Sequence, residues 1–250
     1  GWRQLGYNLT LSRRPMSNTV VSYAGAIDPV TGTQWGGVTA NGVTLGLSYD
    51  QGGAGGVWAS LGAHKLLGTH VQDNHRLSAM TGYYHRLIDR VDERMRVGLT
   101  LMHWQYSKGM DEFTLGQGGY YSPQKYFSVG VPFSYAWRNY NWSVAFETSV
   151  SWSTSSYAGG DRLYISDSDY RIVQADYTPN NGDLYNDSTS ANGLGVRMRL
   201  MAERRLSDHW VVGSGIDWGY SKDYSPSHAF MYLRYVFKPW RGNLALPVEP

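Results

Sequence analysis

The chain has 250 residues, a formal net charge of +2 and a hydrophobic fraction of 42%. A charge so close to zero, without basic clusters, argues against nucleic-acid binding. No apolar run approaches the roughly 18 residues of a transmembrane helix, and the mean hydropathy is only −0.42. A membrane β-barrel needs no such run, because each strand shows lipid only every second residue. One barrel fits this length, although two domains are possible.

The composition favours an envelope protein. There are 10 Trp, 20 Tyr and 6 Phe, and the first two side chains favour membrane interfaces and also stack on sugar rings. The 30 Gly fit strands that bend or face a lumen, and the absence of Cys avoids stray disulfides. The first residues lack the apolar core of a signal peptide. We therefore expect the natural chain to begin well upstream of Gly1.

Alternation of unlike side chains predicts eleven strands, in an all-β fold of the antiparallel, transmembrane outer-membrane barrel class. In chain order they cover residues 5–13, 20–27, 43–49, 57–63, 75–88, 96–104, 127–135, 142–152, 194–203, 210–220 and 228–237. Predicted tight turns cover residues 14–18, 50–55, 89–93, 138–141 and 205–208. Predicted longer loops cover residues 27–41, 65–74, 107–124 and 154–190.

The two faces of each predicted strand suit two solvents. In strand 127–135, one face is large and apolar from Phe127 to Tyr135, while the other holds Ser, Gly and Pro. Strand 194–203 gathers Arg197, Arg199 and Glu203 on one face, which would cost several kcal/mol in lipid. We therefore expect the apolar faces to meet lipid and the polar faces to line a watery lumen.

Loop length predicts the orientation. Bacterial barrels have even strand numbers, short periplasmic turns and long external loops. The tight turns fall on one side of the predicted barrel and the longer loops on the other, apart from a short external loop near residues 221–227. An odd count of eleven should not close in the usual way, so we expect the chain to begin partway round a larger barrel.

One segment carries a family resemblance. Residues 116–126 form a loop with Gly116, Gly118, Gly119 and Pro123, and the strand 127–135 follows at once. Its block Gly-Tyr-Tyr-Ser-Pro-Gln-Lys-Tyr, residues 119–126, resembles the signature of the C-terminal outer-membrane barrel domain of bacterial cellulose synthase protein C.

That family is the outer-membrane cellulose exporter of Gram-negative bacteria. The resemblance implies a barrel of roughly 16 strands, preceded by periplasmic helical repeats of the tetratricopeptide type; no such 34-residue repeat is visible in this sequence. It also implies outer-membrane lipid, the cellulose polymer, and periplasmic and inner-membrane synthase subunits as partners.

Catalytic and metal motifs are weak. The segment 211–215, Val-Val-Gly-Ser-Gly, lacks the spacing of a Gly-x-Ser-x-Gly nucleophile. His70 and His75 flank Asp73 without a third ligand, and two of Glu147, Glu203 and Asp217 would have to meet for glycoside hydrolysis. We expect no enzyme activity, metal or cofactor.

The inward positions are the better candidate. The predicted lumen-lining residues are Trp58, Tyr84, Trp104, Glu147, Arg197, Arg199, Glu203, Asp217, Tyr232 and Arg234. Aromatic rings offer faces to glucose and polar groups can bind hydroxyls, which describes a hydrated track for a neutral glucan. Alternatively, the Arg and Glu side chains only pair with one another and stiffen the wall. Tryptophans at strand ends, Trp142, Trp152 and Trp218, fit an interface belt better.

Three further segments carry predictions. The predicted external gate loop consists of Gly119, Tyr120, Tyr121, Ser122, Pro123, Gln124 and Tyr126, of which Tyr120, Tyr121 and Gln124 would contact emerging polymer. Alternatively, Pro123 and the glycines only fold a structural corner. The end of the barrel resembles an assembly signal at Leu233, Tyr235 and Phe237. We expect a barrel over residues 1–237 and a periplasmic tail over 238–250 that tucks into the lumen or reaches a partner.

The leading hypothesis is a passive, gated pore through which cellulose, plain or decorated, leaves the cell. A general diffusion porin and an adhesin or receptor that binds through residues 154–190 stand as alternatives. Fast, unselective flux of small sugars would favour the porin. Loss of adhesion on deletion of residues 154–190, with glucan secretion intact, would favour the receptor.

Overall fold

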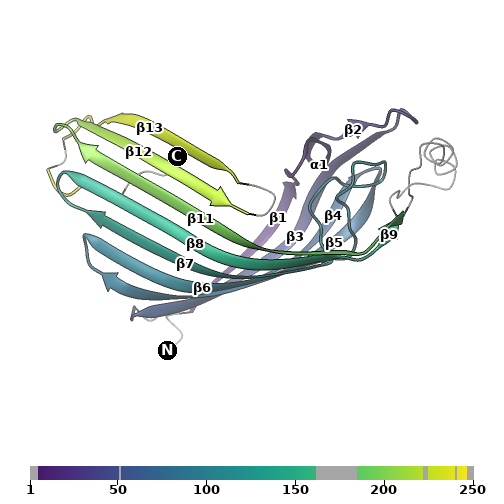
Figure 1. Ribbon diagram of the computed structural model, residues 1–250, viewed down its shortest axis with the longest axis horizontal. Helices are drawn as coiled ribbons and strands as arrows, with labels where there is room; N and C mark the ends of the chain where they lie inside the picture. Colours follow the sequence, from purple (N-terminus) through teal and green to yellow (C-terminus); the bar gives the residue numbers. More distant parts are fainter. Residues whose placement is uncertain (1–4, 51, 162–184, 222–224, 240, 247–250) are drawn as a thin grey trace.

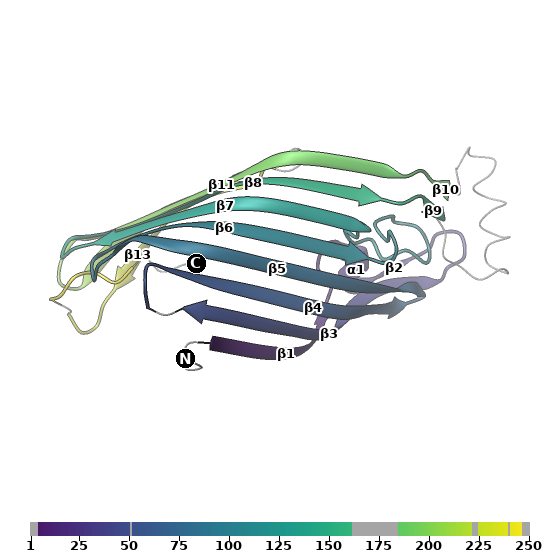
Figure 2. The same cartoon turned by 90° about the horizontal axis from the view of Figure 1, so that it is seen from below.

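A computed structural model describes residues 5–50, 52–161, 185–221, 225–239 and 241–246. They form an antiparallel sheet of eleven strands that curves into the wall of a β-barrel, which confirms the predicted fold class (Figure 1). Ten strands follow one another across the wall in chain order (Figure 2): β1 (Leu5–Pro15), β3 (Gln34–Asp50), β4 (Gly55–Thr69), β5 (Val71–Asp89), β6 (Glu93–Tyr106), β7 (Lys125–Arg138), β8 (Trp142–Tyr157), β11 (Thr189–Arg205), β12 (Trp210–Tyr220) and β13 (Ser227–Tyr235). The shorter elements are α1 (Val20–Ala24), β2 (Ala26–Ile27), β9 (Gly160–Asp161) and β10 (Tyr185–Asn186).

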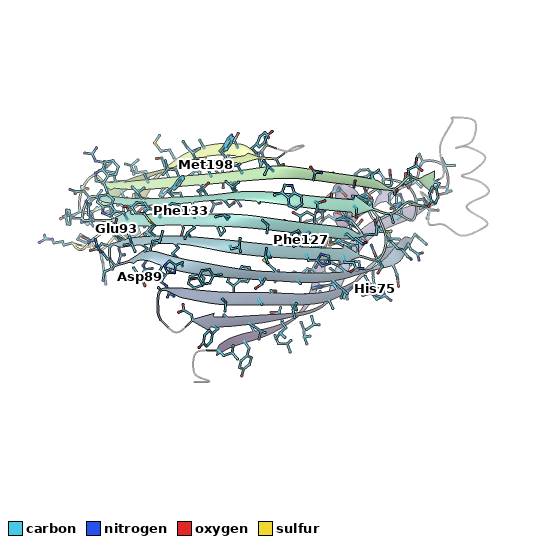
Figure 3. The ribbon with its side chains drawn as sticks, turned by 60° about the horizontal axis from the view of Figure 1, so that its bottom comes forward. His75, Asp89, Glu93, Phe127, Phe133 and Met198 are labelled. Atoms are coloured by element: carbon cyan, nitrogen blue, oxygen red, sulfur yellow. The ribbon has the colours of Figure 1, made fainter. Side chains whose placement is uncertain are left out.

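The two faces of the sheet differ as the alternation predicts. Large apolar side chains project from the outer face, where Leu11 is 81% exposed and Ile216 is 55% exposed. Phe127, Phe133 and Met198 lie on this same face (Figure 3). An isolated soluble sheet would leave this apolar surface in water, so the pattern requires an apolar surrounding.

The strand predicted over residues 20–27 is wrong for most of its length. Residues Val20–Ala24 form α1, because Thr19 accepts a hydrogen bond from the backbone N–H of Ser22 and donates its own N–H to the Ser22 hydroxyl. Gly25, at a φ of 85°, ends the helix. Only Ala26 and Ile27 pair with β3, so local capping outweighed the β-branched composition.

Because residues Val20–Ala24 form a helix and not a strand, the number of strands that cross the sheet is even and not odd. Because β1 pairs directly with β3, residues 14–18 lie at the end of the sheet that holds the long connections, and the tight periplasmic turn predicted there is wrong. Ten strands, an even number, cross the length of the sheet, so the odd count no longer supports a larger barrel. Among the described residues β1 and β13 do not pair, and the sheet is open.

Three predicted loops are shorter than expected. β4 and β5 continue through residues 65–74 and turn at His70, which has a φ of 47°. β3 begins at residue 34, inside the predicted loop 27–41. In the predicted loop 154–190, β8 runs on to residue 157 and β11 starts at 189; residues 162–184 lie outside the described part of the chain. No helix among the described residues is long and apolar enough to cross a membrane.

Candidate functional site: a groove beneath an inward-folded loop

The ten predicted lumen-lining residues lie on one face of the sheet. Register shows this, because directly paired residues of neighbouring antiparallel strands point to the same side. One row runs through Ser134, Glu147, Arg199, Asp217 and His228. The other predicted lumen-lining residues occupy the same alternate positions of their strands. They therefore lie on the face opposite to the one that carries the exposed apolar residues.

Most of the charged members form ion pairs with one another. The buried Asp217 carboxylate accepts hydrogen bonds from Arg197 at 3.0 Å and Arg199 at 2.9 Å. The fully buried Glu203 accepts from Arg234 at 2.7 Å and from the Tyr232 hydroxyl at 2.6 Å. For these residues the structure shows the mutual pairing on which the alternative interpretation, a stiffened wall, depends.

Aromatic residues on this face lie over glycines of the neighbouring strand. A Cβ on Gly82 would stand 2.6 Å from the Trp58 indole, and one on Gly213 would stand 2.2 Å from the Tyr232 ring. These glycines are therefore necessary for ring placement, since real Cβ atoms do not approach so closely. The rings lie flat along the wall and present their faces to the lumen.

A groove runs along the inner face of β8, with β7 and β11 as its sides. The inward residues of β8 are small in its middle: Ser149, Ser151, Ser153 and Ser155. We call this strip the serine groove. Four separate hollows of about 190, 400, 460 and 450 Å³ follow one another along β8, in order from the short-turn end to the long-connection end.

An aromatic platform stands beside the third hollow. Trp104 and Tyr126 lie with ring centroids 5.2 Å apart, opposite Ser151 and Ser153 and the small residues of β11. Tyr121 meets Tyr126 edge-on at 6.4 Å. This arrangement of ring faces beside hydroxyl groups suits a pyranose, which has apolar ring faces and polar edges.

The loop of residues 107–124 folds inward over this end of the groove. Its anchor is Tyr120, which is 1% exposed and lies in a cluster with Val38, Leu66 and Met110. The Tyr120 hydroxyl accepts a hydrogen bond from the buried Asn74 amide at 3.1 Å. Tyr120 therefore faces the wall and does not line the groove.

Tyr121 and Gln124 point to the opposite side, toward β8. Tyr121 packs edge-on against Tyr157 at 6.2 Å and is hydrogen-bonded to Ser155, and burial raises the pKa of its hydroxyl. The Gln124 side chain accepts a hydrogen bond from the Ala158 backbone N–H at 2.9 Å. Consecutive tyrosines thus connect the loop to both sides of the lumen. Ser122 and Pro123 are buried within the loop itself.

Several residues that stabilise this loop were not among the predicted site residues. The Thr19 hydroxyl donates to the Gly119 carbonyl at 2.7 Å, so α1 supports the loop from behind. The Asn74 amide also donates to the Lys108 carbonyl at 2.9 Å. Sequence separations of 34 to 100 residues hide these contacts from any local pattern.

The segment after β13 returns to the inner face. The Leu244 N–H donates to the Asn139 carbonyl at 2.9 Å, and its side chain is 4% exposed. Leu246 lines the first hollow beside Arg94 and Met201. Of the suggested assembly signal, Leu233 and Tyr235 end β13 on the outer face and Phe237 is exposed beyond it.

No metal site stands out in the described part of the chain, where no three His, Asp or Glu side chains are grouped closely enough to hold an ion. Most histidines are placed by other contacts. His70 Nδ1 lies 2.7 Å from the Gln34 carbonyl oxygen, and His209 Nδ1 lies 2.8 Å from that of Val236.

Comparison with known proteins finds relatives that match nearly the whole chain. A relative from Salmonella typhimurium, described as cellulose synthase operon protein C, is 43% identical over 98% of this chain, and one of the same description from Pseudomonas fluorescens is 37% identical over 98%. The chain spans only 21% and 18% of the length of these relatives. The solved β domain of the Bordetella autotransporter Brka aligns over 93% of this chain and 98% of its own, with 12% identity and a TM-score of 0.29.

The family described as the C-terminus of cellulose synthase operon protein C matches residues 1–238. A match of this extent, together with relatives at 37–43% identity, confirms the resemblance carried by residues 119–126. The chain belongs to the family of cellulose synthase operon protein C C-termini.

Proposed function

We propose that this chain is the wall of an outer-membrane pore that exports cellulose made at the inner membrane, passively and behind a gate. The observation that carries the proposal is the serine groove, whose hollows follow one another along the inner face of β8 as far as the loop of residues 107–124. The long connections would face outward and the short turns inward, as in other bacterial barrels.

The chemistry of the groove suits a neutral polymer that must slide. Serine hydroxyls exchange hydrogen bonds with sugar hydroxyls, and the Trp104–Tyr126 platform offers ring faces. Asp217 and Glu203 already hold arginine partners, so their charges bind a passing neutral chain weakly. Many weak contacts allow movement, where a few strong ones would stop it.

The loop of residues 107–124 would act as the gate. Its contacts with β8 through Tyr121 and Gln124 are few and half-exposed, whereas Tyr120 is held in a buried cluster. Emerging polymer would displace the weaker side first and leave the anchor in place.

We expect further protein around this unit. The open edges at β1 and β13 suit additional strands in the natural protein, in a barrel of roughly 16. The relatives are several times longer than this chain, which leaves room for the periplasmic repeats expected to receive cellulose from the synthase subunits. The segment 241–246, which lies against the short-turn end of the lumen, would stand at the periplasmic entrance.

A pair of neighbouring tryptophan substitutions tests the pore. Ser151 faces the groove between Gly130 and Gly195, whereas Val150 is 51% exposed on the outer face. Ser151→Trp should obstruct the groove and abolish secretion of cellulose by cells that carry the full-length gene. Val150→Trp adds the same bulk toward lipid and should leave secretion at the wild-type level.

Secreted and periplasmic glucan would both be measured, with folding checked by the heat-dependent mobility of the barrel in detergent gels. Retained glucan with Ser151→Trp and normal export with Val150→Trp support the pore. Normal secretion by a folded Ser151→Trp variant would refute the groove as the path.

A further inference from the structure

A row of polar and cationic side chains crosses the outer face at the long-connection end. Direct pairing joins Arg13 to Asn41, Asn41 to Lys65, and Lys65 to His75. Lys125 lies on the same face at the start of β7. Arg13, Lys65, His75 and Lys125 are all exposed. Together with Asn41, these residues are called the outer cation row.

The outer cation row follows the apolar band without an intervening row. Two residues toward the middle of each strand lie Leu11, Val43, Ala63 and Leu77, which are paired with one another in the same register. Leu11 is 81% exposed and Leu77 is 56% exposed. In Figure 3, His75 lies at one end of the outer face and Asp89 and Glu93 lie at the other. The change from apolar to cationic is therefore a boundary between hydrocarbon and head groups.

The opposite boundary has a different composition. At the short-turn end the outer face carries Trp142, Trp210 and Tyr235, and the guanidinium of Arg204 lies 5.2 Å from the Trp142 ring centroid. Aromatic rings anchor a protein at any membrane interface, whereas grouped cations call for anions. The two leaflets that this wall would meet are thus distinguished by charge.

We propose that the outer cation row binds the phosphate groups of a phosphorylated glycolipid in the outer leaflet of the membrane. Strand spacing of about 4.8 Å puts Arg13 and Lys65, two strands apart, roughly 10 Å from each other, and His75 directly beside Lys65. The Arg13 guanidinium can grip one phosphate with two N–H groups, while Lys65 and Lys125 hold others as point charges. Acyl chains of the same lipid would lie on the exposed leucines below.

One carboxylate moderates the site. Asp73 holds the Lys65 ammonium at 2.8 Å, and both side chains are about half exposed, at 51% and 48%. An exposed pair of this kind is weak and opens readily to a stronger anion. Removal of the Asp73 charge should therefore strengthen lipid binding, which gives the proposal a test of opposite sign.

The inference rests on the proposed placement in the outer membrane, and its test uses the full-length protein in neutral detergent. The probe is diphosphorylated lipid A, with its dephosphorylated form as the matched lipid, and binding is read by native mass spectrometry. Each cation near an anionic leaflet contributes about fivefold in affinity, so Arg13→Gln/Lys65→Gln/Lys125→Gln should bind about a hundredfold more weakly. Asp73→Asn should bind a few times more tightly, and Arg204→Gln at the opposite rim should bind as the wild type does.

Equal binding by the triple variant and the wild type, or equal binding of the phosphate-free lipid, would overturn the lipid site. The same variants would be assayed for cellulose secretion. Unchanged lipid binding by the triple variant, together with secretion that Ser151→Trp blocks, would refute the lipid site and leave the pore intact. Loss of lipid binding with secretion unchanged supports the site as a separate property of the outer face.

Discussion

Replacement of Tyr120 by Ala should release the loop of residues 107–124, and in the proposed pore this release should increase leakage. Tyr120 is the largest fully buried side chain of the structure's described residues and connects the loop to β3, β4 and β5. It does so through packing against Val38 and Leu66 and through the hydroxyl contact with Asn74 at 3.1 Å.

The magnitude follows from these contacts. Removal of a buried aromatic side chain costs about 3–5 kcal/mol, and loss of one hydrogen bond about 1 kcal/mol. If the cost falls on the docked loop alone, Tyr120→Ala shifts the ratio of open to closed loops by a hundredfold to several thousandfold, at about 1.4 kcal/mol per factor of ten. Tyr120→Phe should shift it by about fivefold. Tyr121, at 40% exposure, should matter less than Tyr120 when replaced by Ala.

The assay is the swelling of liposomes that contain the full-length protein, with glucose and cellotriose as the permeating sugars. Flux should increase in the order wild type, Tyr120→Phe, Tyr120→Ala. A folded barrel keeps its heat-dependent mobility in detergent gels, which separates loop release from unfolding. Wild-type flux through a folded Tyr120→Ala variant would refute the anchor, and a larger flux through Tyr121→Ala would show that the β8 side holds the loop.

Two further predictions concern charge. Glu203→Ala leaves the Arg234 charge without its buried partner and should lower the free energy of unfolding by about 3–5 kcal/mol. The loss would be read from the midpoint of heat-dependent mobility. Glu147→Ala, at an exposed residue, should change the free energy of unfolding little, and equal losses for the two variants would contradict the role of the buried pair. Asp111 is exposed at the surface of the loop, but the loop around it partly desolvates its carboxyl. This desolvation, with a smaller effect of the Glu112 charge, raises the pKa of Asp111 above 3.8. Protonation therefore favours the docked loop at pH below 3.8, and this stabilisation is lost as pH rises through the raised pKa, so sugar flux should rise over that interval. Asp111→Asn should remove this part of the pH dependence, and an unchanged pH profile would count against desolvation of Asp111 as its cause.

Much of the barrel wall could be predicted without coordinates. Alternation between lipid-facing and lumen-facing residues is local, since every second side chain of an extended strand points to the same side. The alternation in strand 127–135 predicts that Phe127 points outward, and the structure confirms this position. The block at residues 119–126 likewise indicates the family without coordinates, because its residues are contiguous in the sequence.

Contacts between distant segments could not be predicted in the same way. Thr19 and Gly119 are 100 residues apart, and the hydrogen bond between them, which supports the loop from behind, leaves no local pattern in the sequence. The missed helix α1 has a different cause: its capping by Thr19 and Ser22 is local, but the β-branched residues of the run from Val20 to Ile27 favour a strand, and the strand count then takes the wrong parity.

The sequence by itself determined that this protein has an oily outer face and a watery inner one, because two solvents select residues with a period of two. Only the tertiary structure decided that Tyr120 faces the wall, that Tyr121 faces β8, and that Glu203 meets Arg234. These choices depend on which strands become neighbours and on how a loop packs, and both are properties of the whole sheet.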